Sequence, residues 1–542
     1  MRETLSVCSV WRQAALDYMW RELNLNIYEE KNEVYDDRPP WVDGYWMPHR
    51  TACLVKELGI IVSWNSIFSG AAFDLLEEYM DATCLPQVYK LRILITDKAI
   101  KLDCVYDKSI SNALKFVELL KRIAPAASSV VFRGSRGGWQ IEEGGGKAFG
   151  AFIQKLFSNA RHSALDLGGI CIAHTSTLAQ ISQLTALIMQ GLTMDDLRTS
   201  LLHRCSNTLI DLGICTNDPK LLISDKDGNA VVYPNLNILT LSSYTKVFTI
   251  DASSVIATPK SIVPFPRLNS LTLHMCYPYA DDVLFKGNSS TLKRLRIYID
   301  GDTVRRLNQC KGLENKHKSL RHVEIIDIVC TKLLQIPEDD INRFLGNLLD
   351  TAQVLKVDTQ YVIRKLITAM RSGYNLNFIQ NLYVQSPGLN IYSILNLVKG
   401  LPALTILECG FRGDGDTGYE FIPAYELPGH IATTYGNAGK NLHTWKLLSY
   451  ASSLGQTAEH VALLGLVCPR LCRIMIGVGN SSHLNARVAE TIKSDAYSKY
   501  AAQLAHLHGI AIAEYGDYTR KGTYRVAHDN HNKVYETDDS WD

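Results

Sequence analysis

The segment Gly-Gly-Gly-Lys at 144–147 is the first motif whose residue types could do chemistry. It precedes a helical pattern formed by Phe149, Phe152 and Leu156. A glycine loop ahead of a helix N-terminus can bind phosphate through backbone N–H groups. The glycine spacing of a phosphate loop is absent, however, and Ala148 stands where that motif has Ser or Thr. We therefore interpret the segment as a flexible loop between structural repeats.

Two pairs of potential metal ligands come next. Cys468 and Cys472 are four residues apart, but a structural zinc site needs four ligands and no second pair lies nearby. His506 and His508 flank Leu507 and could share one face, yet no third ligand is evident. We interpret the cysteines as core residues and the histidines as exposed ones. The sequence predicts no metal and no other cofactor.

Motifs for catalysis and for nucleic-acid binding are weak. The chain has no Gly-x-Ser-x-Gly motif and no local acid–base pair, which predicts that it is not an enzyme. The basic stretch 293–298 could be an RNA-binding strip, but a repeat strand with solvated flanks is the favoured interpretation. The formal net charge is +1, so no global field attracts nucleic acid or an anionic membrane.

A short apolar pattern repeats along the chain and predicts its architecture. It is clearest at Leu236, Leu239 and Leu241, where the last two residues alternate as in a strand. Later copies are Leu268/Leu271/Leu273, Leu292/Leu295/Ile297, Leu320/Val323/Ile325, Ile379/Leu382/Val384, Leu404/Leu407/Cys409, Leu442/Trp445/Leu447, Leu471/Ile474/Ile476 and Leu507/Ile510/Ile512. Looser earlier copies are Val55/Leu58/Ile60, Val88/Leu91/Ile93, Ala127/Val130/Phe132, His162/Leu165/Leu167 and Leu184/Leu187/Met189. Most copies are separated by about 22–38 residues, roughly the spacing of leucine-rich repeats.

Helical patterns lie between these strands. Apolar residues recur at helical spacing within 110–120, 341–348 and 391–398, and Gly400 is a suitable helix stop. Strands joined by helices should be parallel, and a unit of this size cannot bury its own apolar face, so neighbours must stack. The predicted fold class is α/β: a leucine-rich-repeat solenoid, an irregular horseshoe with a parallel concave sheet.

Composition fits a soluble globular chain of 542 residues, with 46% hydrophobic and 20% charged residues. No run approaches the ~20 apolar residues that span a bilayer, and the first residues lack a signal-peptide core, so we expect no membrane partner. The 13 cysteines are scattered and odd in number, which favours reduced, mostly buried thiols. These features together predict a cytoplasmic or nuclear location.

Residues 1–27 carry a different signal. Val-Cys-Ser-Val-Trp at 7–11, Ala-Ala-Leu at 14–16 and Met-Trp at 19–20 resemble the second half of an F-box. With the repeats that follow, the chain resembles the divergent F-box and leucine-rich-repeat proteins common in fungi. The resemblance implies contact with a Skp-type linker subunit. The residues that would make it are Leu5, Cys8, Trp11, Leu16 and Trp20.

The resemblance also implies a function. Such proteins are substrate-recognition adaptors of cullin–RING (SCF-type) ubiquitin ligases, so the repeats would bind a protein target that the sequence does not name. The opening helix of the F-box would lie upstream of Met1. Either the gene model is truncated or this chain docks poorly, and we expect weak linker binding by residues 1–542. The alternative is a leucine-rich-repeat scaffold without ligase coupling.

Four segments are predicted: a partial F-box at 1–27, a connecting loop at 28–50, the solenoid at 51–514 and a flexible polar tail at 515–542. Side chains alternate along a strand, so residues beside the buried ones must point to the opposite, concave face. Tyr and Arg are over-represented at binding hot spots. The candidate target-binding face comprises Arg296, Tyr298, Glu324, Lys356, Asp358, Tyr383 and Lys446.

Overall fold

The structure is a computed structural model, and the residues it describes fall into two compact units, Met1–Leu268 and Asn269–Asp542. Each unit is described by itself. The described residues are 20–28, 33–36, 52–80, 83–96, 107–134, 139–141, 143–167, 170–172, 181, 183–189, 201–215, 220–223, 225, 229–242, 263–274, 291–299, 304, 323–330, 342–345, 348–349, 352–358, 360–371, 373, 376–411, 433–436, 438–447, 464–465, 467–477 and 509–513.

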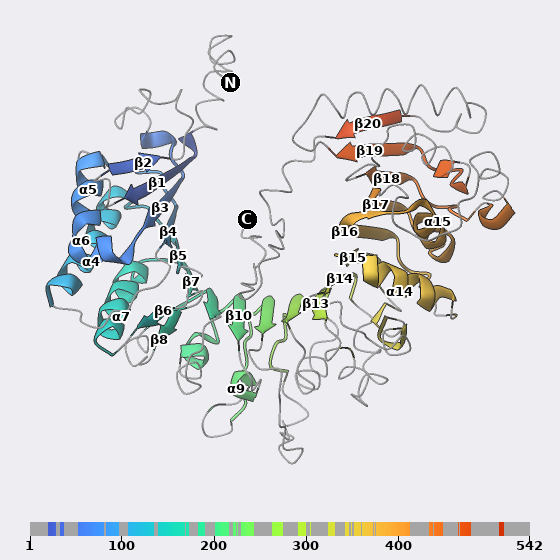
Figure 1. The fold of residues 1–542 in the computed structure, drawn as a ribbon. Helices are drawn as coiled ribbons and strands as arrows, with labels where there is room; N and C mark the ends of the chain where they lie inside the picture. Colours follow the sequence, from blue (N-terminus) through green and yellow to red (C-terminus); the bar gives the residue numbers. More distant parts are fainter. Residues whose placement is uncertain are drawn as a thin grey trace, which may run out of the picture. The chain divides into compact units, whose positions relative to one another are not determined.

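The first unit is built on one sheet with helices on one of its faces (Figure 1). Its strands are β1 (Glu22–Tyr28), β2 (Glu33–Asp36), β3 (Glu57–Val62), β4 (Lys90–Ile95), β5 (Ser129–Arg133), β7 (His162–Asp166), β9 (Ala186–Met189), β10 (Asp211–Cys215) and β11 (Ile238–Ser242). From β1 and β3 onward each pairs in parallel with the next, in chain order. A separate pair, β6 (Trp139–Ile141) and β8 (Ile170–Ile172), is also parallel. Parallel order is therefore confirmed for these repeats.

One strand departs from this order. β2 lies within 28–50, the segment predicted to be a connecting loop, and pairs with β1 antiparallel. A tight reversal allows an antiparallel partner without a crossover helix. β2 covers the edge of β1 that would otherwise expose unpaired backbone groups. The prediction of a plain loop is wrong at these four residues.

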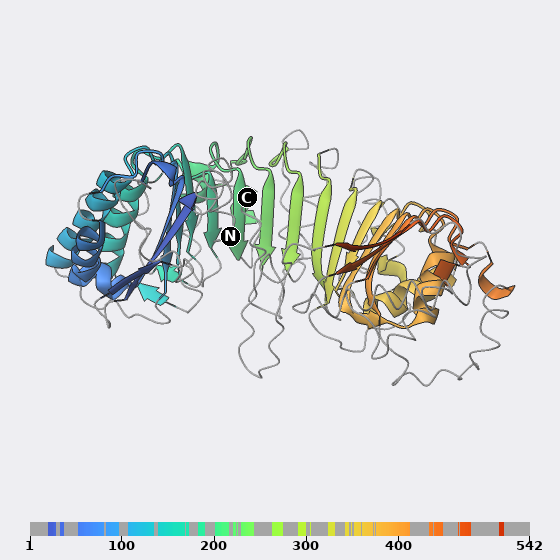
Figure 2. The same ribbon diagram turned by 90° about the horizontal axis from the view of Figure 1, so that it is seen from above.

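Aromatic side chains contribute to the packing of the sheet of the first unit against its helices. They are α4 (Trp64–Ser69), α5 (Ala71–Met80), α6 (Asp107–Ile123), α7 (Glu143–Phe157) and α9 (Lys220–Ile223), and Figure 2 shows α6 and α7 on the same side of the sheet. The Trp64 ring lies 5.7 Å from Phe132 of β5, 5.5 Å from Phe149 and 5.2 Å from Phe152 of α7. All four rings have 0% exposure. Aromatic burial thus ties two helices to one strand.

The interpretation of 144–147 as a loop is also wrong. α7 begins at Glu143, so the three glycines lie within the first turn of the helix. Glycine weakens a helix by roughly 1 kcal/mol relative to alanine. The apolar stripe of Phe149, Phe152 and Leu156, which is buried, outweighs that cost. A phosphate-binding loop ahead of a helix is not present here.

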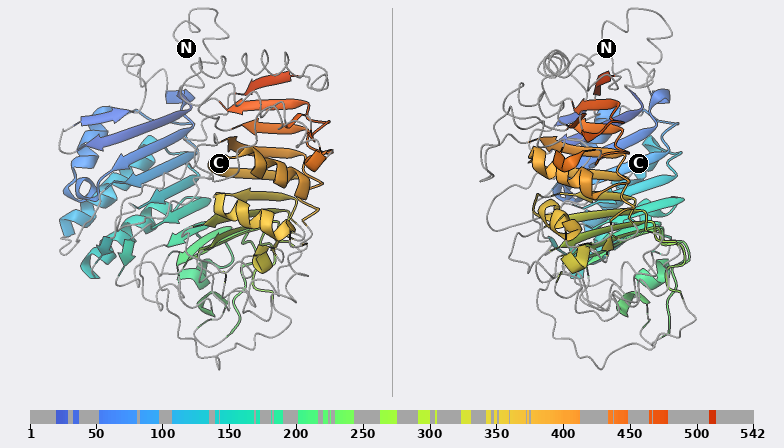
Figure 3. Two further views of the ribbon diagram at one scale, coloured as in Figure 1. Left: turned by 45° about the vertical axis from the view of Figure 1, so that its right-hand side comes forward. Right: turned by 90° about the vertical axis from the view of Figure 1, so that its right-hand side faces the viewer.

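The second unit repeats the same architecture. Its strands are β12 (Ser270–His274), β13 (Arg294–Ile299), β14 (Ile325–Cys330), β15 (Val354–Val357), β16 (Asn381–Leu389), β17 (Ile406–Phe411), β18 (Thr444–Leu447), β19 (Arg473–Gly477) and β20 (Gly509–Ala513). Every neighbouring pair is parallel and follows chain order. Helices α14 (Gln360–Arg371) and α15 (Ile391–Gly400) lie on one side of this sheet (Figure 3).

Most predicted apolar triplets form the core. Leu236, Leu239 and Leu241 are buried, as are the corresponding residues of the copies at 268–273, 292–297, 379–384 and 404–409. The prediction of a helix ending near Gly400 is confirmed by α15, which Asn390 caps by accepting a hydrogen bond from the Ser393 N–H. The predicted tail and the histidines at 506, 508, 528 and 531 lie outside the described residues.

The predicted register of the apolar triplet at 320–325 is wrong. The buried positions are Val323, Ile326 and Ile328, and Ile326 pairs with Leu295 of β13. Six apolar residues crowd into 320–329, so two registers fit the same spacing in the sequence. Pairing with the neighbouring strand selects one of them, because a shift by one residue would turn every side chain to the other face.

Candidate protein-binding face

The sheet face opposite the helices of the second unit carries one line of in-register side chains. Each occupies the position between the last two apolar residues of its repeat, so side-chain alternation points it away from the core. We call this line the central row. Its members are Thr272, Arg296, Asp327, Lys356, Tyr383, Glu408, Lys446 and Met475.

An ion pair joins two side chains in the first half of the central row. Arg296 Nε lies 3.3 Å from Asp327 Oδ2, and the two side chains are only 12% and 13% exposed. The Arg296 guanidinium also lies 5.3 Å from the centre of the Tyr298 ring, and that ring stacks on His274 at 3.8 Å. Burial, with Arg296 nearby, lowers the pKa of His274 to about 3, so this imidazole is neutral. The charges of Arg296 and Asp327 at this end of the row are therefore paired with each other.

The second half of the central row gathers two ammonium groups on one aromatic ring. Lys356 Nζ and Lys446 Nζ each lie 5.6 Å from the centre of the Tyr383 ring. They reach it from β15 and β18, on opposite sides of the β16 strand that carries it. Lys446 Nζ also lies 3.3 Å from Glu408 Oε2. We call Lys356, Tyr383 and Lys446 the basic clamp.

Six of the seven predicted target-binding residues fall into three groups. Arg296, Lys356, Tyr383 and Lys446 all belong to the central row, as the repeat pattern predicts. Asp358 follows β15 and is half-buried. Tyr298 is on the same face but only 4% exposed, because His274 and Arg296 cover its ring.

Glu324 is a correction. It precedes β14 and lies 3.8 Å from Lys293 at the strand entry, outside the central row. The register predicted for that repeat placed Glu324 on the face. In the structure, Asp327 occupies the position of this repeat in the central row. Glu408 was also missed, although its place between Leu407 and Cys409 is visible in the sequence. With these two carboxylates, the central row carries three cations and two carboxylates.

The F-box-like residues lie mostly beyond the described part of the chain. Leu5, Cys8, Trp11 and Leu16 are outside it. Trp20 is described and has 0% exposure, as do Leu23 and Leu25. Because Leu23 pairs with Leu58 and Leu25 with Ile60, Trp20 stands in the first apolar position of the first repeat. Its indole is part of the repeat core.

The open face of the first unit holds an unusual carboxylate. Asp211 begins β10, between Ala186 of β9 and Ile238 of β11, and is half-buried. Burial raises the pKa of Asp211 to about 7. No hydrogen bond or ion pair of this side chain is found among the described residues. The repeat that contains it, Leu209/Leu212/Ile214, was missed, although its spacing matches the pattern.

Elsewhere on this face the ions are paired. Arg133 Nε lies 3.2 Å from Asp166 Oδ2, and Lys90 Nζ lies 3.4 Å from Glu57 Oε2. Arg92 pairs with Glu22, and the Asn24 side chain lies over Gly59. A Cβ at Gly59 would meet Asn24 Oδ1, so the Asn24 side chain would have to shift if Gly59 were replaced.

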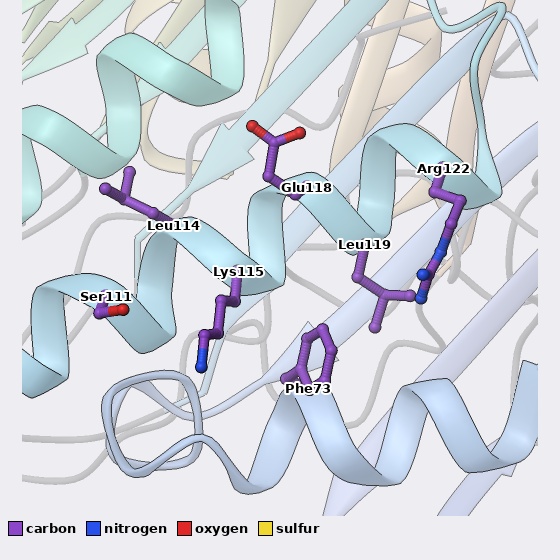
Figure 4. A pocket seen from close by; sticks show the side chains of 7 residues that line it. All are labelled: Phe73, Ser111, Leu114, Lys115, Glu118, Leu119 and Arg122. Carbon is purple, nitrogen blue, oxygen red and sulfur yellow. The ribbon is translucent and has the colours of Figure 1, made fainter.

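A hollow on the helical side of the first unit is a second candidate (Figure 4). Phe73 of α5 faces Leu119 of α6 across it, and Lys115 and Arg122 stand at its rim. Arg122 pairs with Glu77. Glu118 points away from Phe73 and pairs with Lys155 of α7 at 2.6 Å. The charged side chains around this hollow are mostly paired within the unit. The hollow therefore leaves fewer charges for a partner to bind than the basic clamp does.

Metal ligands and membrane-spanning helices are the remaining possible features of the described residues. Among them, no group of three or more His, Cys, Asp or Glu side chains could hold a metal ion. Cys468 is buried, and burial raises its pKa to about 12. Cys472 Sγ lies 3.6 Å from the carbonyl oxygen of His443. No helix in the described ranges is long and apolar enough to cross a membrane.

The parallel strand order, the buried triplets and the single helical face define the class of this chain: an α/β solenoid of the leucine-rich-repeat type. No protein-family model and no curated protein matches the sequence. Among solved structures, the chain is similar to a yeast complex of Rad7 and Elc1, with 14% identity, a TM-score of 0.28, and coverage of 79% of this chain and 78% of that one. It is also similar to the leucine-rich repeat-containing protein LegL7 from Legionella pneumophila, with 9% identity, a TM-score of 0.27, and coverage of 76% and 91%.

Proposed function

We propose that this chain is a protein-interaction subunit whose open sheet face in the second unit binds a protein target. The observation that carries the proposal is the central row, in which charged and aromatic side chains from successive strands stand in register. The buried apolar residues beneath them hold their backbones in fixed positions. Pre-organised side chains lose less conformational entropy on binding than flexible ones do. Tyr383 supplies a large, rigid contact surface of the kind enriched at hot spots.

The test compares a face variant with a helix-side variant. We expect Lys356→Ala with Tyr383→Ala to lose partners that the wild-type chain captures from cells expressing it, measured by quantitative mass spectrometry. The control is Arg364→Ala with Arg371→Ala, two exposed residues of α14. This control should retain the same partners, because the helices lie on the other side of the sheet. Loss of the same proteins from both variants, or from neither, would contradict the proposal.

We further propose that the chain is a substrate-recognition adaptor of a cullin–RING (SCF-type) ubiquitin ligase. The support is the resemblance of residues 1–27 to the second half of an F-box, followed by repeats. An adaptor performs no bond chemistry itself. It raises the effective concentration of a target's lysine near a bound conjugating enzyme. The second candidate, a scaffold without ligase coupling, differs only in lacking the linker contact.

The linker contact is predicted to depend on Trp11 and not directly on Trp20. A Skp-type linker subunit titrated against the purified chain should bind weakly, and Trp11→Ala should abolish that binding with no change in Tm. Trp20→Ala should instead lower stability by about 3–5 kcal/mol, the range for a buried aromatic side chain. Binding should strengthen on extension with an upstream F-box helix. Absence of binding with and without the extension, with target capture intact, would favour the scaffold.

We propose the cytoplasm or nucleus as the compartment. The support is the 13 cysteines of the chain, which are scattered and odd in number. Disulfides form and persist mainly in oxidising compartments. Cys205, Cys409 and Cys468 are buried and pack as small apolar residues.

A further inference from the structure

We infer that the segment bound at the basic clamp is acidic: a stretch of partner protein in which carboxylate side chains stand beside apolar ones. This inference rests on the proposed function and adds the chemistry of the partner. It starts from the number of cations and carboxylates around Tyr383. Lys446 is matched by Glu408 at 3.3 Å, with side-chain exposures of 22% and 10%. Lys356 touches the Tyr383 ring and has no carboxylate partner among the described residues.

The nearest carboxylate in register is already engaged. Asp327 pairs with Lys356 across β14 and β15, yet its carboxylate oxygen is bound to Arg296 at 3.3 Å. Among the described residues, the two ammonium groups of the basic clamp therefore have one carboxylate partner, Glu408. Lys356 is half-buried. A charge near low-dielectric surface interacts more strongly with an incoming ion than one in bulk water. An arriving carboxylate would give Lys356 the counter-charge that Arg296 and Lys446 already have.

The surrounding face has the same sign. Arg294 and Arg473 are exposed on it, two residues before Arg296 and Met475 of the central row. Within the described part of the second unit, the face carries five cations against three carboxylates. The cations are Arg294, Arg296, Lys356, Lys446 and Arg473, and the carboxylates are Asp327, Asp358 and Glu408. This excess would steer an acidic segment towards the clamp.

A basic segment finds little to bind. The Asp327 and Glu408 side chains are only 13% and 10% exposed, and both are paired with cations of the same row. Apolar side chains lie beside the clamp, since Val354 and Ile406 precede Lys356 and Glu408 by two residues and are half-buried on the same face. A segment that places apolar side chains on Val354 and Ile406 and a carboxylate at Lys356 would therefore match this part of the face.

The test measures fluorescence anisotropy with three labelled 12-residue probes. Each repeats Xaa-Leu-Gly-Xaa three times, with Glu, Gln or Lys as Xaa. The wild-type chain should bind the Glu probe at least about tenfold more tightly than the others, which equals about 1.4 kcal/mol. Lys356→Met, which removes the charge and keeps the stem, should lower that affinity at least about fivefold. Added salt should weaken it.

The matched control is Lys399→Met. Lys399 also carries its ammonium group over a tyrosine, with Nζ 5.5 Å from the Tyr435 ring, but it lies on α15 at the helical side. This variant should bind the Glu probe like the wild type. Equal binding of the three probes, absence of Glu-probe binding, or an unchanged affinity in Lys356→Met would overturn the inference. Tighter binding of an oligothymidine of equal charge would overturn it in favour of phosphate.

The outcome separates this inference from the proposed function. If capture of cellular partners depends on Lys356 and Tyr383 but the Glu probe is not preferred, the acidic chemistry fails and the protein-binding face stands. If capture is also independent of these residues, both fail. Circular dichroism of Lys356→Met guards against misfolding, and a half-exposed lysine-to-methionine change should leave the spectrum unchanged.

Discussion

Replacing Trp64 by alanine is expected to lower the free energy of unfolding of the first unit by about 3–5 kcal/mol, the range measured for buried aromatic truncations. The indole has 0% exposure and lies within 6 Å of Phe68, Phe132, Phe149 and Phe152. Its removal leaves a cavity where α4, α7 and β5 meet. Because a solenoid is stabilised by nearest-neighbour contacts, the loss should reach adjacent repeats. Chemical denaturation measures the change, and hydrogen exchange locates it.

Phe378→Ala is the control for Trp64. This aromatic side chain is 54% exposed, so its truncation removes little buried surface. We expect a change within about 0.5 kcal/mol, as for most surface substitutions. If Trp64→Ala costs no more than Phe378→Ala, the aromatic cluster does not hold the helices to the sheet. Faster exchange at β3 and β5 with β10 unaffected would show that the damage stays local.

Asp211→Asn is expected to act in the opposite direction and stabilise the protein above pH 7. Burial raises the pKa of Asp211 from 3.8 to about 7, so the folded state holds a proton that the unfolded state has lost in that interval. Stability contributed by this group is therefore lost as the pH rises from about 4 to about 7. Each unit of pKa difference corresponds to about 1.4 kcal/mol, which gives a gain on the order of 2–4 kcal/mol for the neutral amide.

The measurement is the difference in unfolding free energy between wild type and Asp211→Asn from pH 4 to pH 8. The difference should grow with pH and level off above pH 7. Other titrating groups, including His274, cancel in it because both proteins contain them. Glu78→Gln, at an exposed position of α5, is the control and should show no such trend. A pH-independent difference, or destabilisation at pH 8, would mean that Asp211 has a partner that satisfies its charge.

The stability cost at Asp211 bears on function. Uncompensated titratable groups concentrate at functional sites, where they are retained despite their cost. Asp211 lies on the open face of its unit, as the basic clamp does in the other unit. A large stabilisation in Asp211→Asn would therefore show that the wild-type residue lowers the stability of the protein, as residues retained for function often do.

The repeated apolar spacing predicts the fold because its physical cause is local. Leu271 and Leu273 must face one side of a strand whatever lies next to them, and both are buried. The spacing fails where apolar residues are in excess, as at Ile325 and Ile326, since only pairing with β13 chooses between them. β2 was missed because an antiparallel edge strand of four residues has no repeat of its own.

The sequence predicts which residues share the candidate face but not which charges pair on it. Alternation along the strands placed Lys356, Tyr383 and Lys446 on one face, and the structure brings these three together. The burial of Tyr298 could not be predicted, because it depends on His274 in the preceding strand, 24 residues earlier in the chain. Pairs such as Arg296 with Asp327 likewise depend on which repeats become neighbours.

The alternating charges of the central row have a consequence for how this chain can evolve. Solenoids commonly gain and lose whole repeats, because each unit contacts only its neighbours. Here two pairs of neighbouring repeats supply each other's counter-charge, Arg296 with Asp327 and Glu408 with Lys446, so these repeats are not interchangeable. Loss of the β14 repeat would set Arg296 beside Lys356, and loss of the β17 repeat would leave Lys446 without Glu408. The charge pairs of the row therefore constrain the order of the repeats. Duplication or deletion of a repeat within β13–β18 should be selected against even where the apolar core would tolerate it.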